Sequence, residues 1–128
     1  MTRSGHCLCG EVSYTGTPTS GVLHCHCENC RRLTGNHIAA VRTKTTDLTI
    51  VDATGQLRWH ELGYARYGFC RSCGSTLFFQ PDDQLHTSMT TGTMDNVEGL
   101  ELESVWFAHE RQPHSPVPEG VPHYDGNA

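Results

Sequence analysis

The chain has 128 residues, which is enough for one domain with its own core but short for two. Only 18% of the residues are charged and the formal net charge is −5, which disfavours non-specific binding to nucleic acid or to an anionic membrane. Hydrophobic residues, cysteines included, make up 36%, so we expect a thin apolar core that needs further support.

The compartment is predicted from apolar runs and cysteine usage. No run of apolar residues approaches the ~20 that span a bilayer, and residues 1–6 lack the apolar segment of a secretory signal. We therefore expect a cytoplasmic protein without a membrane partner, in which thiols stay reduced. Seven cysteines cannot all pair internally, and clustered reduced cysteines are typical of metal sites or catalysts.

Short segments of apolar and β-branched residues, separated by Gly, Asp, Asn and Pro, predict an all-β fold. The expected strands span residues 11–15, 22–24, 38–42, 48–51, 57–61, 76–79, 85–88 and 102–108. One short helix is expected over residues 28–34, closed by Gly35 at its C-terminal end. Proline at alternate positions of 113–118 indicates a loop or an extended wrap over the sheet. No linker or repeat divides the chain, so residues 1–128 are expected to form a single domain.

The seven cysteines fall into an outer pair of clusters and a middle one. The outer clusters contain Cys7, Cys9, Cys70 and Cys73. Structural zinc is almost always bound by four ligands in a tetrahedron, so two cysteines from each outer cluster can complete one site. Such a site would contribute on the order of 10 kcal/mol of apparent binding free energy, which compensates for a thin core.

The middle cluster supplies three thiols, Cys25, Cys27 and Cys30. Catalytic zinc takes three protein ligands and leaves one position open, so this cluster indicates a second, open site. A different partition, in which Cys25 and Cys27 join the 70/73 pair, would leave the first two cysteines without partners. His24 or His26 could also close the second site as a fourth ligand, although His26 would have to fold back sharply between two ligands.

The order of the cysteine motifs resembles the glutathione-dependent formaldehyde-activating family. The motifs read CLCGEV (7–12), CHCENCRRLTG (25–35) and FCRSCGS (69–75), followed by GTMD (92–95) and EGVP (119–122). The resemblance covers about residues 5–124, the expected core of the domain. The chain departs from the family pattern at Ser104, where a histidine is frequent, and within 110–114, where a tryptophan is frequent.

The resemblance implies a β-tent fold, in which two antiparallel sheets meet around a structural zinc, with a short helix or turn near the second metal. It implies two zinc ions, one structural and one catalytic or labile. The implied ligands of the structural zinc are Cys7, Cys9, Cys70 and Cys73. Those of the second zinc are Cys25, Cys27 and Cys30. The family's activity joins formaldehyde to the thiol of glutathione, or reverses that reaction as a carbon–sulfur lyase. We therefore expect an enzyme whose partners are a small thiol and an aldehyde.

Several other side chains are candidates for roles beside the second zinc. Arg31 and Arg32 follow the last thiol of the middle cluster and could pair with the carboxylates of a glutathione-like thiol, or form a solvated helix face. The alkoxide that forms from an aldehyde needs a proton, and the candidate donors are His24, His26 and His37. The aromatic residues are interpreted as core or cavity wall; they are Trp59, Tyr64, Tyr67, Phe69 and Trp106.

Other classes of protein are weighed against the enzyme. The alternative is a non-catalytic zinc-binding interaction module with the same fold, which would have two permanently closed metal sites and an exposed apolar patch. A nucleic-acid-binding zinc ribbon is disfavoured by the net charge and the scattered arginines. A thiol–disulfide or sulfoxide reductase would need a reactive cysteine free of metal. The sequence is compatible with a homo-oligomer.

Overall fold

The computed structural model describes residues 1–127, and it is built mostly of β-strands. Within this range the strands are β1 (Arg3–His6), β2 (Ser13–Gly16), β3 (Val22–Cys25), β4 (Ile38–Lys44), β5 (Thr49–Val51), β6 (Leu57–Glu61), β7 (Ala65–Cys70), β8 (Thr76–Pro81), β9 (His86–Thr90) and β10 (Leu102–Trp106). The helix is α1 (Glu28–Thr34), and three 3₁₀ helices are η1 (Thr45–Asp47), η2 (Thr91–Thr93) and η3 (Ala108–Glu110). None of the described helices is long and apolar enough to cross a membrane.

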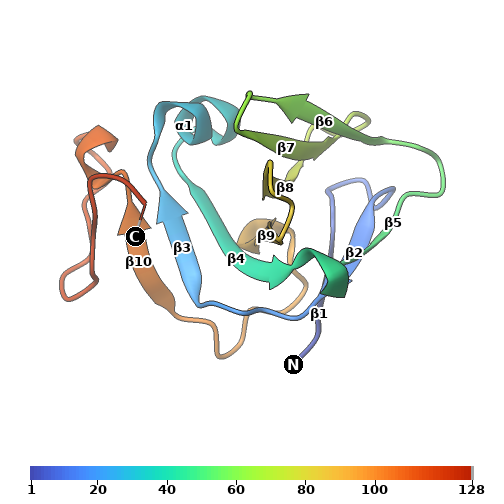
Figure 1. The fold of residues 1–128 in the computed structure, drawn as a ribbon, viewed down its shortest axis with the longest axis horizontal. Helices are drawn as coiled ribbons and strands as arrows, with labels where there is room; N and C mark the ends of the chain where they lie inside the picture. Colours follow the sequence, from blue (N-terminus) through green and yellow to red (C-terminus); the bar gives the residue numbers. More distant parts are fainter. Residues whose placement is uncertain (128) are drawn as a thin grey trace.

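The strands form two sheets, as expected (Figure 1). The larger sheet has the order β10-β3-β4-β9-β8-β7-β6, and the smaller sheet has the order β1-β2-β5. Every pair of neighbouring strands is antiparallel except β3 and β10, which run parallel. The prediction of two antiparallel sheets is therefore wrong for this one pair, because β10 returns to the sheet edge from the far end of the chain.

The main core lies between the two sheets. Its largest fully buried side chains include Tyr14 from the small sheet and Val41, Phe78 and Met89 from the large one. The rings of Tyr14 and Phe78 meet edge to face with centroids 5.1 Å apart. Cys7 and Cys70 are fully buried at the edge of the same cluster, so the four-cysteine site is continuous with the core.

Helix α1 forms where the sequence predicts it. Cys27 is the N-cap residue, and its sulfur accepts a hydrogen bond from the Cys30 backbone N–H at 3.5 Å. Gly35 ends the helix with φ of 91°, a left-handed conformation that glycine adopts without steric cost, and its N–H donates to the Arg31 carbonyl. A second, smaller core cluster lies beneath the helix and includes Ile38, Ala40 and Tyr67.

Two strands had no counterpart in the sequence prediction, namely β1 and β7. The other strands match the predicted segments with shifts of a few residues at their ends. The segment expected over 102–108 ends at Trp106, because the next residue, Phe107, has a positive φ of 53°. Residues 113–118 form no strand, as their prolines predict, and the chain beyond them runs beside β10 through a bridge between Val105 and His123.

Candidate metal centres

The four outer cysteines converge at the junction of the two sheets. Cys7 and Cys9 follow β1, Cys70 is the last residue of β7, and Cys73 lies in the turn before β8. The Cys9 sulfur lies 3.6 Å from the Cys7 sulfur and 3.7 Å from the Cys70 sulfur. All four sulfurs lie within 4.8 Å of one another. A tetrahedral metal with metal–sulfur bonds of about 2.3 Å needs sulfurs about 3.8 Å apart. The four side chains therefore fit a metal ion.

Tight turns surround these sulfurs, and the Val12 N–H donates to the Cys7 sulfur at 3.4 Å. Gly10 and Gly74 both have φ of 82°, and their N–H groups donate to the Cys7 and Cys70 carbonyls. Burial opposes ionisation of Cys73, but the Ser75 hydroxyl and nearby backbone N–H groups outweigh it and lower the pKa of this thiol to about 5. Such a thiol is readily present as the thiolate that a metal requires.

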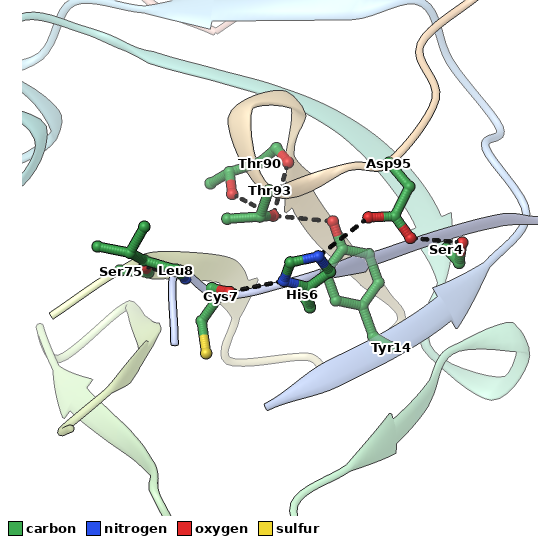
Figure 2. A network of polar contacts seen from close by, with 9 residues as sticks. All are labelled: Ser4, His6, Cys7, Leu8, Tyr14, Ser75, Thr90, Thr93 and Asp95. Carbon is green, nitrogen blue, oxygen red and sulfur yellow. Dashed lines mark hydrogen bonds and ion pairs between the residues drawn. The ribbon is translucent and has the colours of Figure 1, made fainter. Parts of the chain in front are cut away.

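A polar network fixes the N-terminal half of this site (Figure 2). Asp95 accepts a hydrogen bond of 2.8 Å from the Ser4 hydroxyl and lies 3.5 Å from His6 Nε2, while the other His6 nitrogen lies 2.7 Å from the Cys7 carbonyl. On the other side, the Leu8 N–H donates to the Ser75 hydroxyl at 3.0 Å. The cysteine pair after β1 is thus held to the η2 loop and to the turn that carries the second pair.

The three middle cysteines form a separate group. Cys25 ends β3, Cys27 caps α1 and Cys30 lies within the helix, and their sulfurs lie within 4.8 Å of one another. Among the described residues, no histidine, aspartate or glutamate places a ligand atom equally close to all three. The Tyr67 hydroxyl lies 2.8 Å from the Cys30 sulfur, and both residues are buried. This trio could hold a metal with three protein ligands.

The three thiols divide their protons unequally. Hydrogen bonds from Cys25 and Cys30 lower the pKa of Cys27 to about 2, whereas the bond that Cys25 makes to Cys27 raises its own pKa to about 12. The pKa of Cys30 is raised by its hydrogen bonds to the other two thiols. Burial raises the pKa of Tyr67, so its hydroxyl stays protonated and is able to donate a hydrogen bond to the Cys30 sulfur.

A cavity of about 460 Å³ opens directly onto the three middle cysteines. Its walls combine aromatic and carboxylate side chains from α1, β7, β8 and the segment after β10. Besides the cysteines it is lined by Glu28, Asn29, Tyr64, Ala65, Tyr67, Phe79, Pro81, Phe107, Glu110 and Asn127. Pockets of 300–1,000 Å³ are typical of small-molecule sites, so the cavity has the size of a binding site for a small ligand.

The candidate histidines lie elsewhere. None of His24, His26 and His37 lines the cavity; they form a group of their own, with one ring nitrogen of each within 4.8 Å of the others. Because side chains alternate along a strand, His24 points away from the face on which Cys25 lies. The structure therefore places the histidines neither as proton donors in the cavity nor as a fourth ligand of the middle cysteines.

The two candidate arginines lie on α1 outside the cavity lining. Arg32 is exposed and donates through Nε to the Glu28 carboxylate at 3.0 Å. Arg31 is half-buried. Since Glu28 does line the cavity, the ion pair places a guanidinium beside its rim rather than within it.

Sequence reasoning missed three features of the cavity. It treated Tyr67 as wall without the sulfur contact, and it assigned nothing to Phe107 or Glu110. The Glu110 carboxylate accepts a hydrogen bond from the Glu28 backbone N–H at 3.3 Å, which connects η3 to the start of α1. Phe107 and Glu110 are about eighty positions from the middle cysteines in the sequence. No local sequence pattern predicts that they line the same cavity.

The fold and the clusters together define the class of protein: a small β domain with a four-cysteine cluster in its frame and a three-cysteine cluster facing a cavity, each with the geometry to hold a metal ion. The chain belongs to the glutathione-dependent formaldehyde-activating enzyme family, whose model matches residues 2–110. A crystal structure of a Rhodobacter sphaeroides protein is similar to it in fold, with a TM-score of 0.64 and 23% identity over 94% of this chain and 99% of that one. No curated protein matches the sequence.

Proposed function

We propose that this protein is a zinc-dependent carbon–sulfur lyase that forms or cleaves adducts between formaldehyde, or a related aldehyde, and glutathione or a similar thiol. Membership in the formaldehyde-activating family supports the reaction class. The observation that carries the proposal is the opening of a three-cysteine group onto a cavity of about 460 Å³. The proposed catalytic residues are Cys25, Cys27 and Cys30, and the outer four cysteines are proposed to hold a structural zinc.

The reaction adds a thiol across a carbonyl group. The thiol sulfur forms a bond to the aldehyde carbon, the carbonyl π bond breaks, and the thiol proton ends on the oxygen, giving a hydroxymethyl thioether. When bound by the three cysteines, zinc would supply an ionised thiol as the nucleophile. Much of the rate enhancement would come from holding two small reactants in contact.

Two tyrosines are placed to serve this chemistry. Tyr67 donates toward Cys30 and so limits the excess negative charge on the sulfur group. Tyr64 is more exposed, and its hydroxyl accepts a hydrogen bond from Asn29 Nδ2 at 3.1 Å while it lines the cavity. Its own O–H is therefore free to pass a proton to the oxygen of the aldehyde.

We further propose that Arg31 and Arg32 contact carboxylates of the thiol from outside the cavity. The position of Arg32 beside the rim of the cavity supports this role, and a thiol carboxylate would compete there with Glu28 for its guanidinium. Replacing both arginines with alanine should raise KM for glutathione several-fold and leave KM unchanged for a thiol without carboxylates. Equal effects on both thiols would refute the role.

A single domain over residues 1–128 and a cytoplasmic location belong to the same proposal. Long-range contacts that tie Cys9 to Cys70 and Val105 to His123 support a single folding unit. Seven free thiols, which metal binding requires, favour a reducing compartment.

The test measures exchange between formaldehyde and its glutathione adduct by NMR, together with the zinc content of the protein. The wild type should accelerate exchange and hold two zinc ions. Cys27→Ala should lose one zinc and the acceleration, while keeping the other zinc and its fold. Two zinc ions that ignore every thiol, with no acceleration by the wild type, would overturn the proposal in favour of a non-catalytic zinc module.

A further inference from the structure

The proposed lyase activity does not use a compact group of three histidines, which consists of His24 on β3, His26 just after that strand and His37 just before β4. The ring centroids of His24 and His37 are 4.2 Å apart, and those of His26 and His37 are 4.8 Å apart. One nitrogen from each ring lies within 4.8 Å of the other two. Each ring therefore offers one nitrogen to the same small region.

The arrangement follows from the strand pairing. His24 and His26 are two residues apart, so they emerge on the same side of an extended chain, opposite to Cys25 and Cys27. In the register of β3 and β4, Cys25 lies across from Ile38. His37, directly before that residue, is therefore brought beside His26 at the end of the pair.

These rings lack the partners that buried imidazoles normally have. His37 Nδ1 is buried without a hydrogen-bond partner, and only 4% of the surface of His26 is exposed. Within the described residues, no hydrogen bond or ion pair involves a side-chain nitrogen of these three, whereas His6 and His109 both have such partners. An unsatisfied buried nitrogen destabilises the fold, and a metal ion that accepts its lone pair would remove that cost.

We propose that His24, His26 and His37 form a third metal site, which binds a divalent transition-metal ion such as Zn²⁺, Ni²⁺ or Cu²⁺. Imidazole suits these ions, and three imidazoles with one position open to solvent form a recurrent ligand set. A tetrahedral ion with metal–nitrogen bonds of 2.0–2.1 Å needs nitrogens about 3.3 Å apart. The nitrogens lie within 4.8 Å of one another, so binding requires the half-buried His24 and His37 rings to rotate and close that spacing.

The site differs chemically from both cysteine clusters. Its ligands are neutral, so they do not offset the charge of the ion as thiolates do, and Arg111 lies close enough to His26 to disfavour added positive charge. We therefore expect binding weaker than at either cysteine cluster, with occupancy that follows the supply of metal. The site lies on the opposite face of β3 from the catalytic cavity, so it is independent of the lyase proposal.

The experiment uses the full chain with its cysteine clusters saturated by zinc. Titration with Co²⁺, followed by calorimetry and visible absorption, should show one additional equivalent whose spectrum lacks the charge-transfer bands of cobalt–thiolate bonds. His24→Ala and His37→Ala should weaken this binding by about tenfold or more, since even supporting residues around a metal commonly change affinity 10–100-fold. His86→Ala, at an exposed histidine on β9, is the matched control and should bind as the wild type does.

A second measurement does not depend on variants that fold. In ¹⁵N-resolved NMR of the wild-type protein, added Zn²⁺ should shift the ring nitrogens of these three histidines together and leave those of His86 in place. The proposal is overturned if no equivalent binds beyond the cysteine clusters. It is equally overturned if the bound cobalt shows thiolate bands, if His37→Ala binds as tightly as the wild type, or if the three rings do not respond to zinc.

Discussion

Replacing Tyr67 with phenylalanine removes a single oxygen atom, the one that lies 2.8 Å from the Cys30 sulfur. The ring itself is expected to stay, because it is 1% exposed and packs against Phe79 with centroids 5.1 Å apart. The substitution therefore isolates one hydrogen bond to the Cys30 sulfur, which becomes a thiolate when a metal is bound. Cys30 is only 3% exposed, so water has little access to replace the lost donor.

The expected loss can be worked out from these contacts. Hydrogen bonds to charged groups contribute about 1.5–3 kcal/mol, and with about 2 kcal/mol the zinc affinity of the three-cysteine site should fall roughly 30-fold. Competition with a chelator of known affinity measures this change while the four-cysteine site stays loaded. Because a bound metal stabilises the folded state according to its affinity, the melting temperature of the zinc-loaded protein should also fall by several degrees.

Tyr64→Phe is the matched control for this experiment. It removes a hydroxyl from the same cavity, but that hydroxyl contacts Asn29 and no sulfur. Its zinc affinity should stay within about threefold of the wild type. If Tyr67→Phe also stays within that range, or if both variants lose affinity equally, the Tyr67 hydroxyl does not stabilise the thiolate.

Three further predictions concern the frame of the fold. Cys9 is exposed, so Cys9→Ser should leave the packing of the core unchanged. The variant should lose one zinc ion and several kcal/mol of stability, as measured by zinc content and thermal melts. A full complement of zinc and an unchanged melt would contradict this prediction. Gly5→Ala should destabilise the protein by about 3 kcal/mol in a denaturant titration, since a Cβ there collides with the Tyr14 hydroxyl and the Thr93 carbonyl. Gly92→Ala is the control and should be near neutral in the same titration, because a Cβ at that position meets open space. Burial raises the pKa of Tyr14 to about 12, so between pH 10 and 12 the Tyr14 hydroxyl ionises in the unfolded state before it does in the folded state. The free energy of unfolding of the wild type should therefore fall by up to about 1.4 kcal/mol per pH unit relative to Tyr14→Phe. Parallel profiles of stability against pH for the two proteins would refute this.

The sequence was sufficient for elements that carry their own local signals. The helix was predictable because Gly35 ends it, and β4 and β8 were predictable from β-branched and aromatic residues between turn signals. Strand β1 reads Arg-Ser-Gly-His, which contains no residue of high β-propensity. It becomes a strand because distant residues hold it: Asp95 binds Ser4, and Tyr14 packs over Gly5.

Strand β7 illustrates a different limit. Gly68 lies in its middle, and glycine in a strand pattern normally weakens the prediction. The structure gives the reason for the glycine, because a Cβ at this position would lie 3.0 Å from both Phe78 and Trp59. The close approach of these aromatic rings depends on tertiary packing, so it cannot be predicted from a short segment of sequence.

The positions of the histidines, by contrast, followed from a signal that was present in the sequence. The strand predicted over 22–24 stops one residue short of β3, which ends at Cys25. Extending the alternation through residues 24–27 separates two histidines on one face from two cysteines on the other. Truncating the strand hid this separation, so the histidines remained candidate proton donors beside the middle cysteines.

This alternation makes the register of β3 decisive for the chemistry. A slip of one residue would exchange sulfur and nitrogen ligands between the two faces, placing imidazoles in the cavity and thiols behind it. The register is fixed on one side by Leu23 across from Ala40, both buried, and on the other by the His26 N–H bond to the Trp106 carbonyl at 3.0 Å. The parallel partner β10 therefore does more than close the sheet edge. It holds the strand end at which both groups of candidate ligands emerge, and the arrangement of the middle cysteine group depends on contacts made eighty residues away.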